Sequence, residues 1–172
     1  MKVFTIFLIA ILLLGCKYTT RKNEYIILTN GFSMNPSEPR IGIEITLDSI
    51  YYCQEKSGGN GDYNYYVGDL DAQTFIKIKT EILKDFKSFK PHEYLVKDGQ
   101  EYQMIYNIEN MNDTLLLELS FITEKQYALI EQIISLKDKS KFREIKYHSF
   151  PEKLLKYKLP EPPRLDSIGR NL

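Results

Sequence analysis

The sequence predicts an α+β domain, in which an antiparallel sheet of about six or seven strands carries two helices on one face. Three observations lead to this fold class. Short stretches of alternating apolar residues recur along the chain, separated by turn residues such as glycine, asparagine and aspartate. Tyrosine and isoleucine, which favour half-buried strands, are abundant, with 13 tyrosines in 172 residues. Residues 72–89 and 124–136 instead place their apolar side chains at helical spacing.

Strands account for the first part of the domain. Residues 24–28 predict a short strand, and residues 40–55 predict a long one. The apolar alternation of the long strand shifts phase near Asp48-Ser49, which indicates a β-bulge. Residues 56–62 predict a flexible glycine-rich turn, and residues 63–67 predict the returning strand of a hairpin.

The first helix is predicted to begin after Asp71 as its N-cap, to run from Ala72 to Phe89, and to stop at Pro91. Burial of its apolar face against the sheet is the main predicted source of stability. The side chains of this face are Phe75, Ile76, Ile78, Ile82, Leu83, Phe86 and Phe89.

The second helix is predicted to begin at a capping box formed by Thr123 and Gln126 and to run to Leu136. Its predicted buried side chains are Tyr127, Ile130, Ile133 and Ile134. Both helices are expected to lie on the same face of the sheet, over Ile43, Ile45, and Leu116 or its neighbours.

The remaining strands follow from turn signals and apolar runs. Residues 94–108 predict a hairpin around Asp98-Gly99, a strong short-turn signal. Residues 110–113 predict another turn, and the strongly apolar residues 114–121 predict a strand at the centre of the sheet. Residues 142–148 predict the last strand. A single domain is therefore expected over residues 24–157, followed by a proline-rich extended or disordered tail at 158–172.

One internal similarity suggests a duplicated ββα unit. The residues at 71, 75, 78 and 82 are matched by similar residues at 123, 127, 130 and 134, each 52 positions later. Both regions read as strand, turn, strand and helix. The alternative is that any two amphipathic helices produce such matches.

The first sixteen residues differ in character from the rest. Lys2 precedes an apolar run from Val3 to Leu14, and Gly15-Cys16 closes it. The run is too short to span a membrane, which takes about 20 apolar residues, and has the length of a signal-peptide core. Leu13-Leu14-Gly15-Cys16 resembles the Leu-x-Gly-Cys lipobox of bacterial lipoproteins.

The resemblance implies cleavage between Gly15 and Cys16, a diacylglycerol thioether on the sulfur of Cys16, and an acyl chain such as palmitate on its amine. Residues 1–15 would then be a cleaved signal peptide and residues 16–23 a lipidated tether. Lipoproteins of the Bacteroidetes type that reach the cell surface carry an acidic cluster after this cysteine. The tether has none, so we expect an outer-membrane anchor with the domain facing the periplasm. A buried apolar helix and an uncleaved membrane anchor are the alternatives.

Charge and cysteine content narrow the function classes. The 23 basic and 23 acidic residues cancel, which argues against a nucleic-acid partner. If Cys16 carries lipid, the only other cysteine, Cys53, has no disulfide partner within the chain. Its strand-like surroundings predict a small buried apolar residue, not a reactive thiol.

No catalytic, cofactor-binding or metal-binding residue is predicted. The two histidines, His92 and His148, have no cysteine or second histidine near them in the sequence, as a local metal site would need. The chain also lacks a Gly-x-Ser-x-Gly nucleophile elbow. Residues 60–71 faintly resemble a calcium loop, but Tyr65 and Asp71 stand where such a loop has glycine and glutamate.

Paired tyrosines are the one feature that indicates a protein partner. Tyr51-Tyr52 and Tyr65-Tyr66 are predicted to face each other across a hairpin, with one member of each pair exposed. Cross-strand packing is the alternative. The expected function is a membrane-anchored binding or interaction module of the cell envelope. The alternatives are a hydrolytic enzyme whose site is assembled in space and a purely structural envelope lipoprotein.

Overall fold

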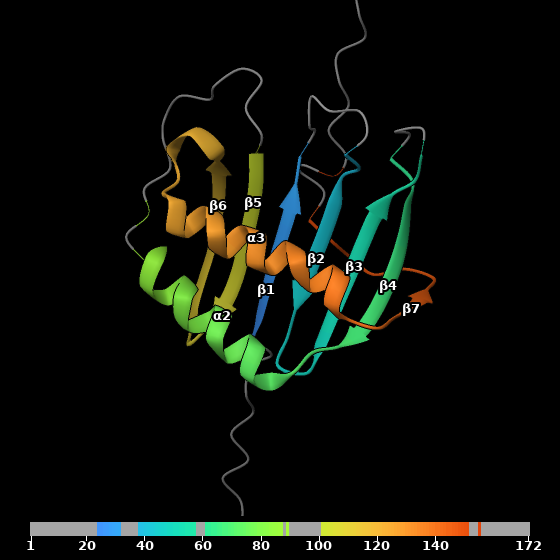
Figure 1. The fold of residues 1–172 in the computed structure, drawn as a ribbon, viewed down its shortest axis with the longest axis horizontal. Helices are drawn as coiled ribbons and strands as arrows, with labels where there is room; N and C mark the ends of the chain where they lie inside the picture. The colour runs from blue at the N-terminus through green and yellow to red at the C-terminus, as the bar shows by residue number, and fades with distance from the viewer. Residues whose placement is uncertain are drawn as a thin grey trace, which may run out of the picture.

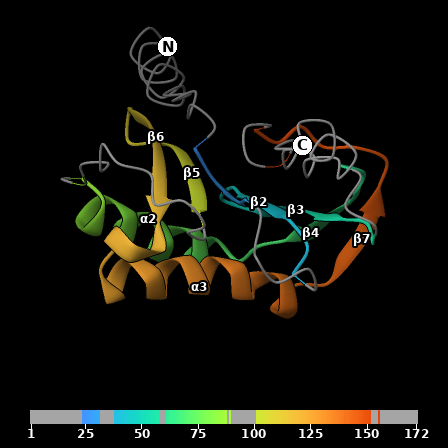
Figure 2. The same cartoon turned by 90° about the horizontal axis from the view of Figure 1, so that it is seen from above.

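The computed structural model describes residues 24–31, 38–57, 61–87, 89, 101–151 and 155. They form a seven-stranded antiparallel sheet with two helices on one face, which confirms the predicted fold class (Figures 1 and 2). The elements are β1 (Tyr25–Asn30), β2 (Ile41–Ile45), β3 (Ser49–Glu55), β4 (Tyr63–Asp69), α2 (Ala72–Asp85), β5 (Glu101–Ile108), β6 (Met111–Glu118), the 3₁₀ helix η1 (Leu119–Phe121), α3 (Glu124–Lys139) and β7 (Phe142–Ile145).

The sheet is built outwards from β1. Its strand order is β6-β5-β1-β2-β3-β4-β7, so β1 to β4 form a meander and the β5–β6 hairpin adds on the other side of β1. The prediction that the strand at 114–121 lies at the centre is wrong, because β6 is an edge strand and ends at Glu118. Its apolar character reflects Leu115 and Leu117, which are buried under the helices.

The predicted long strand at 40–55 is also wrong, because a tight turn divides it into β2 and β3. The amide of Thr46 donates to the carbonyl of Ser49 at 2.9 Å, and the amide of Ser49 donates to Oγ1 of Thr46 at 3.1 Å. Asp48 Oδ1 accepts from the Ser49 hydroxyl at 2.9 Å. Short polar side chains stabilise this turn by bonding the local backbone. The phase shift in the sequence therefore marks a hairpin, not a bulge.

Both predicted helix starts are confirmed. The Asp71 side chain accepts from the amide of Thr74 at 3.0 Å, so it caps α2. Thr123 and Gln126 form the full capping box of α3, each side chain accepting from the other's amide. The Gln126 side chain also donates to the carbonyl of Asp85 at 2.9 Å, which joins the start of α3 to the end of α2. The first helix ends at Asp85, earlier than predicted, and the second continues to Lys139.

The main core lies between the two helices and the sheet. Phe75, Ile78 and Ile82 of α2 are almost fully buried, as predicted. Ile76, placed on the same face by the sequence, is 44% exposed. In α3 the prediction was wrong for Tyr127, which is 41% exposed. The side chains of α3 that are buried are Gln126, Leu129, Ile130, Ile133 and Leu136. The buried face of α3 is thus rotated from the predicted one towards Leu129 and Leu136, and Ile134 at its border is half-buried.

Turns elsewhere differ from the sequence prediction in detail. The β5–β6 turn consists of Glu109 and Asn110, both with positive φ (49° and 66°), so β6 already begins at Met111. Positive φ at two successive residues matches the tight turns that fit the twist of a hairpin. The last strand ends at Ile145, three residues before the predicted end. The predicted strand at 94–96, the turn at Asp98-Gly99, and residues 1–23 and 158–172 lie outside the described residues.

The suggested duplication stays a prediction. The two helices lie on the same face and their N-caps are 52 residues apart. The matched positions differ in burial, however, because Phe75 is 1% exposed and Tyr127 is 41% exposed. A membrane-spanning helix is not found in the described part of the chain, where no helix is long and apolar enough.

Candidate functional site

The sheet face that points away from the helices, called here the second face, carries the candidate site. Cross-strand register places Glu44 between Ile27 and Tyr51 on this face. The segment that follows β7 lies over this face, on the opposite side of the sheet from the helices (Figure 2). We call residues 146–151 together with Leu155 the covering segment. A small apolar cluster joins it to the sheet and contains Cys53, Phe150, Leu155, Ile27, Tyr51, Tyr63 and Tyr65.

His148 makes the first contact of the covering segment. Its Nε2 lies 2.9 Å from Oε2 of Glu44, although the two residues are 104 positions apart in the chain. Its ring stacks on Tyr51, with centroids 3.9 Å apart and planes within 6°. Both partners project from neighbouring strands, so the sheet fixes the carboxylate and the stacking surface together. The predicted assignment of His148 to the end of a strand is wrong, since β7 ends at Ile145.

Phe150 makes the second contact, over Gly42. Its side chain is 8% exposed. A Cβ on Gly42 would lie 2.8 Å from Cδ1 of Phe150 and 2.9 Å from Sγ of Cys53. Real Cβ atoms do not approach other atoms so closely, so glycine at this strand position leaves the space that the ring fills.

Cys53 packs in the same cluster as the ring and is fully buried. Burial raises the pKa of its thiol from the ordinary 9.0 to about 12, which keeps it protonated at neutral pH. A protonated, covered thiol is a poor nucleophile. The prediction that Cys53 is a small buried residue is therefore confirmed.

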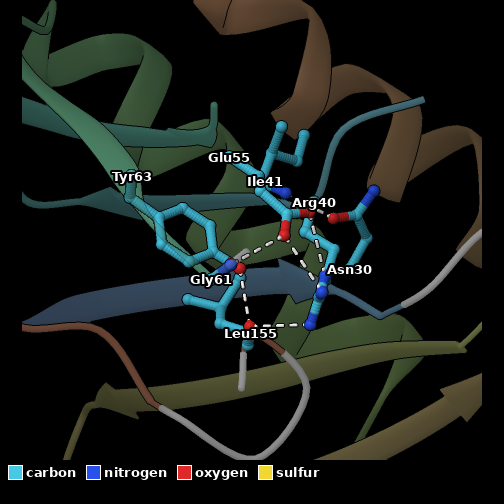
Figure 3. Close-up of polar contacts among 7 residues, drawn as sticks. All are labelled: Asn30, Arg40, Ile41, Glu55, Gly61, Tyr63 and Leu155. Carbon is cyan, nitrogen blue, oxygen red and sulfur yellow. Dashed lines mark hydrogen bonds and ion pairs between the residues drawn. The ribbon is translucent and has the colours of Figure 1, made fainter. Parts of the chain in front are cut away.

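Leu155 makes the third contact, at a buried ion pair (Figure 3). Arg40 and Glu55 lie on neighbouring strand ends and bond bidentately, Nε to Oε2 and Nη2 to Oε1, both at 3.0 Å. Their side chains are 10% and 8% exposed. The carbonyl of Leu155 accepts from Nη1 of Arg40 at 2.8 Å and from the hydroxyl of Tyr63 at 2.6 Å. Burial raises the pKa of Tyr63 and outweighs the opposing effect of Arg40, so its hydroxyl stays a donor.

Further polar contacts fix this end of the sheet. The amide of Ile41 donates to Oδ1 of Asn30 at 2.6 Å, and the amide of Gly61 donates to Oε1 of Glu55 at 3.3 Å. Figure 3 shows these groups around the same guanidinium. Charge-assisted and bidentate hydrogen bonds are the strong ones in proteins, so the guanidinium of Arg40 that bonds Leu155 is held rigidly.

The predicted tyrosine surface needs correction. Tyr52 is 7% exposed and packs on Tyr66 on the helix side of the sheet, with ring centroids 5.8 Å apart. Tyr51 and Tyr65 lie on the second face and are half-buried, and the register pairs them with Val67 and Cys53, not with each other. Cross-strand packing therefore accounts for Tyr52 and Tyr66, whereas Tyr51 and Tyr65 contact the covering segment. Alternation placed one member of each pair on each face, as expected, but did not show what covers them.

The tyrosines that are exposed among the described residues are others. Tyr147 of the covering segment is 64% exposed and lies edge-on to Tyr65, with centroids 5.2 Å apart. Tyr127 of α3 is on the far side of the sheet. On the second face, the exposed tyrosine thus belongs to the covering segment itself.

The other residues considered as sites in the sequence either lie outside the described residues or form regular secondary structure. Gly15, Cys16 and His92 lie outside the described residues. Residues 63–69 form β4, so the calcium-loop alternative is wrong. Within the described ranges, no cluster of three or more His, Cys, Asp or Glu residues is arranged to hold a metal ion.

The sequence reasoning did not identify Gly42, Glu44, Arg40 and Glu55 as site residues. Arg40 and Glu55 carry opposite charges at the two ends of the predicted strand 40–55. Folding that stretch into a hairpin brings its ends together, so a correct turn assignment would have paired them. The Glu44–His148 contact joins distant segments and leaves no local signal. No family model, curated protein or solved structure matches the chain.

Proposed function

We propose that the protein is a bacterial lipoprotein, anchored through Cys16, whose domain is a binding or interaction module of the cell envelope facing the periplasm. The observation that carries this proposal is the apolar run that ends in Leu13-Leu14-Gly15-Cys16. Its length suits a signal peptide, and its last residues resemble a lipobox. Residues 17–23 then form the tether between lipid and domain.

The way the chain enters the fold is consistent with a tethered domain. Glu24, the first residue after the tether, accepts hydrogen bonds from Nζ of Lys79 at 3.0 Å and from the amide of Glu109 at 3.0 Å. Lys79 also pairs with Glu109 at 3.3 Å. Burial alone would lower the pKa of Lys79, but the hydrogen bonds to both glutamates raise it, so the ammonium stays charged. The junction between the tether and the domain is therefore held in a fixed position.

The position of Glu24 determines how the anchored domain would be oriented relative to the membrane. The tether of seven residues reaches at most about 25 Å, so the end of the sheet with Glu24 and Glu109 would be the end nearer the membrane. The Arg40–Leu155 contact lies at the other end of the strands, beyond Asn30. The proposal thus turns that end towards the periplasm.

Surface features support a protein partner. Tyr147 is exposed beside the half-buried Tyr65, and tyrosine is enriched where proteins bind one another. Within the described residues, β7 pairs only with β4, so its outer edge offers unpaired backbone groups. Such an edge can receive a strand from a partner.

The anchor is tested by Cys16→Ala in the native bacterium. The variant should lose labelling by a fatty-acid probe and should leave the membrane fraction. Cys53→Ala is the matched control and should keep both properties. Wild-type labelling and fractionation of Cys16→Ala would contradict the proposal.

Protease added before and after permeabilisation of the outer membrane reports which way the domain faces. Crosslinking in intact cells tests for a protein partner.

A further inference from the structure

The covering segment is held on the second face as a bound peptide would be. It makes three separate contacts, a hydrogen bond from His148 to a carboxylate, an aromatic ring of Phe150 over a glycine, and a carbonyl of Leu155 that accepts two hydrogen bonds. Within the described residues, 146–151 form no backbone-to-backbone hydrogen bond. An aromatic anchor in a fitted space with a few polar groups around it is the usual anatomy of peptide recognition.

The residues that receive the segment are positioned by the sheet itself. Arg40 and Glu55 are locked together by two hydrogen bonds. Glu44 and Tyr51 are cross-strand neighbours, as are Gly42 and Cys53. Because strand pairing sets these positions, the receiving surface is expected to keep its shape when the segment leaves.

Packing separates the segment from the main core. The helix-covered core contains Phe75, Ile82 and their neighbours but neither Phe150 nor Leu155. Those two residues belong to the smaller cluster with Cys53 on the second face. Release of the segment would therefore expose the second face while the main core stays packed.

We propose that the second face is a peptide-binding site that the covering segment occupies in cis. Its partner is an extended protein segment that presents a histidine or another cationic group and, two residues later, an aromatic ring. This inference rests on the proposed interaction module and names the partner class. The cis segment competes at high effective concentration, so a partner binds only by displacing it. A second copy of this chain is a less suitable partner, because its covering segment already occupies its own second face. We therefore expect the partner to be a different protein.

Cys53 supplies the test, because its buried thiol packs in the same cluster as the ring of Phe150. The chain has two cysteines, so Cys16→Ala leaves Cys53 as the sole thiol. In this full-length background, Phe150→Ala should raise the rate of thiol modification by dithionitrobenzoate about tenfold or more. Cooperative thermal unfolding should be retained. Tyr127→Ala, which removes an exposed ring from α3 on the other side of the sheet, is the matched control and should leave the rate unchanged.

A synthetic peptide of residues 146–155 should then protect Cys53 of the Phe150→Ala chain saturably, and the same peptide with alanine for phenylalanine should not. An unchanged thiol rate in Phe150→Ala, or the absence of protection by the peptide, would overturn the proposal. Loss of cooperative unfolding would place the segment in the core and overturn it as well. A concentration-dependent dimer of Phe150→Ala in ultracentrifugation would assign the site to a second copy. These measurements use unlipidated chain, so they succeed or fail independently of the anchor.

Discussion

The ring of Phe150 lies against Gly42 at a distance that a methyl group would not allow. An added Cβ would stand 2.8 Å from Cδ1 of the ring. Glycine in the interior of a strand ordinarily weakens it, by about 0.5–1 kcal/mol relative to alanine. Here the missing side chain is what lets the covering segment approach the sheet.

Gly42→Ala is therefore expected to destabilise the protein, opposite to the usual effect of alanine in a strand. We expect a loss of about 1–3 kcal/mol in the free energy of unfolding, as for other overpacked sites. Urea denaturation measures it. The double variant Gly42→Ala/Phe150→Leu should lose less than the sum of the two single changes, because the shorter side chain makes room. Full additivity would show that the two residues do not touch.

Glu55→Gln should cost about 3–5 kcal/mol, because it leaves the buried guanidinium of Arg40 without its counter-charge. The matched control is Glu24→Gln at the more exposed pair with Lys79, which should cost at most about 1 kcal/mol. Chemical denaturation of both variants gives the comparison. Equal losses of stability in the two variants would contradict the conclusion that the Arg40–Glu55 pair is more buried than the Lys79–Glu24 pair.

Ile82→Asp is expected to unfold the domain, because Ile82 is fully buried between α2 and the sheet. Ile76→Asp lies in the same helix and should change stability by about 1 kcal/mol or less, since Ile76 is 44% exposed. Circular dichroism during thermal unfolding distinguishes the two. A melting temperature of Ile82→Asp like that of the wild type would show that the helix face is misassigned.

The pKa of Cys53, raised to about 12 in the folded state, predicts alkaline destabilisation. The unfolded thiol loses its proton near pH 9 while the folded thiol keeps it, so the folded state binds more protons between these values. The stabilising contribution is present in full below about pH 9 and is lost as the pH rises towards 12. Stability should therefore fall less steeply with pH in Cys53→Ala than in the wild type. Parallel curves from pH 8 to 10.5 would contradict the raised pKa.

Local chemistry is the part of the fold that the sequence predicts well. Asp71 and the pair Thr123 and Gln126 mark the helix starts because a cap bonds only to its own first turn. The turn between β2 and β3 was missed because Thr46 and Asp48 build it without glycine or proline. Burial of single helix residues, such as Ile76, depends on how the helix sits on the sheet, which periodicity alone does not determine.

Sheet order and the covered second face depend on contacts between distant residues. The pairing of β1 with β5, which moves β6 to the edge, is not encoded in either strand alone. The same holds for Glu44 and His148, 104 residues apart. Tyr51 and Tyr65 could be placed on a face by alternation, but their neighbours could not be predicted.

The most direct test of the covered second face is a nuclear Overhauser spectrum of the folded protein. It should show cross-peaks from the ring protons of Phe150 to the α-protons of Gly42 and the β-protons of Cys53. The ring contact between Tyr52 and Tyr66, on the other face, serves as an internal reference. Cross-peaks for the reference pair without any between Phe150 and Gly42 or Cys53 would contradict the account.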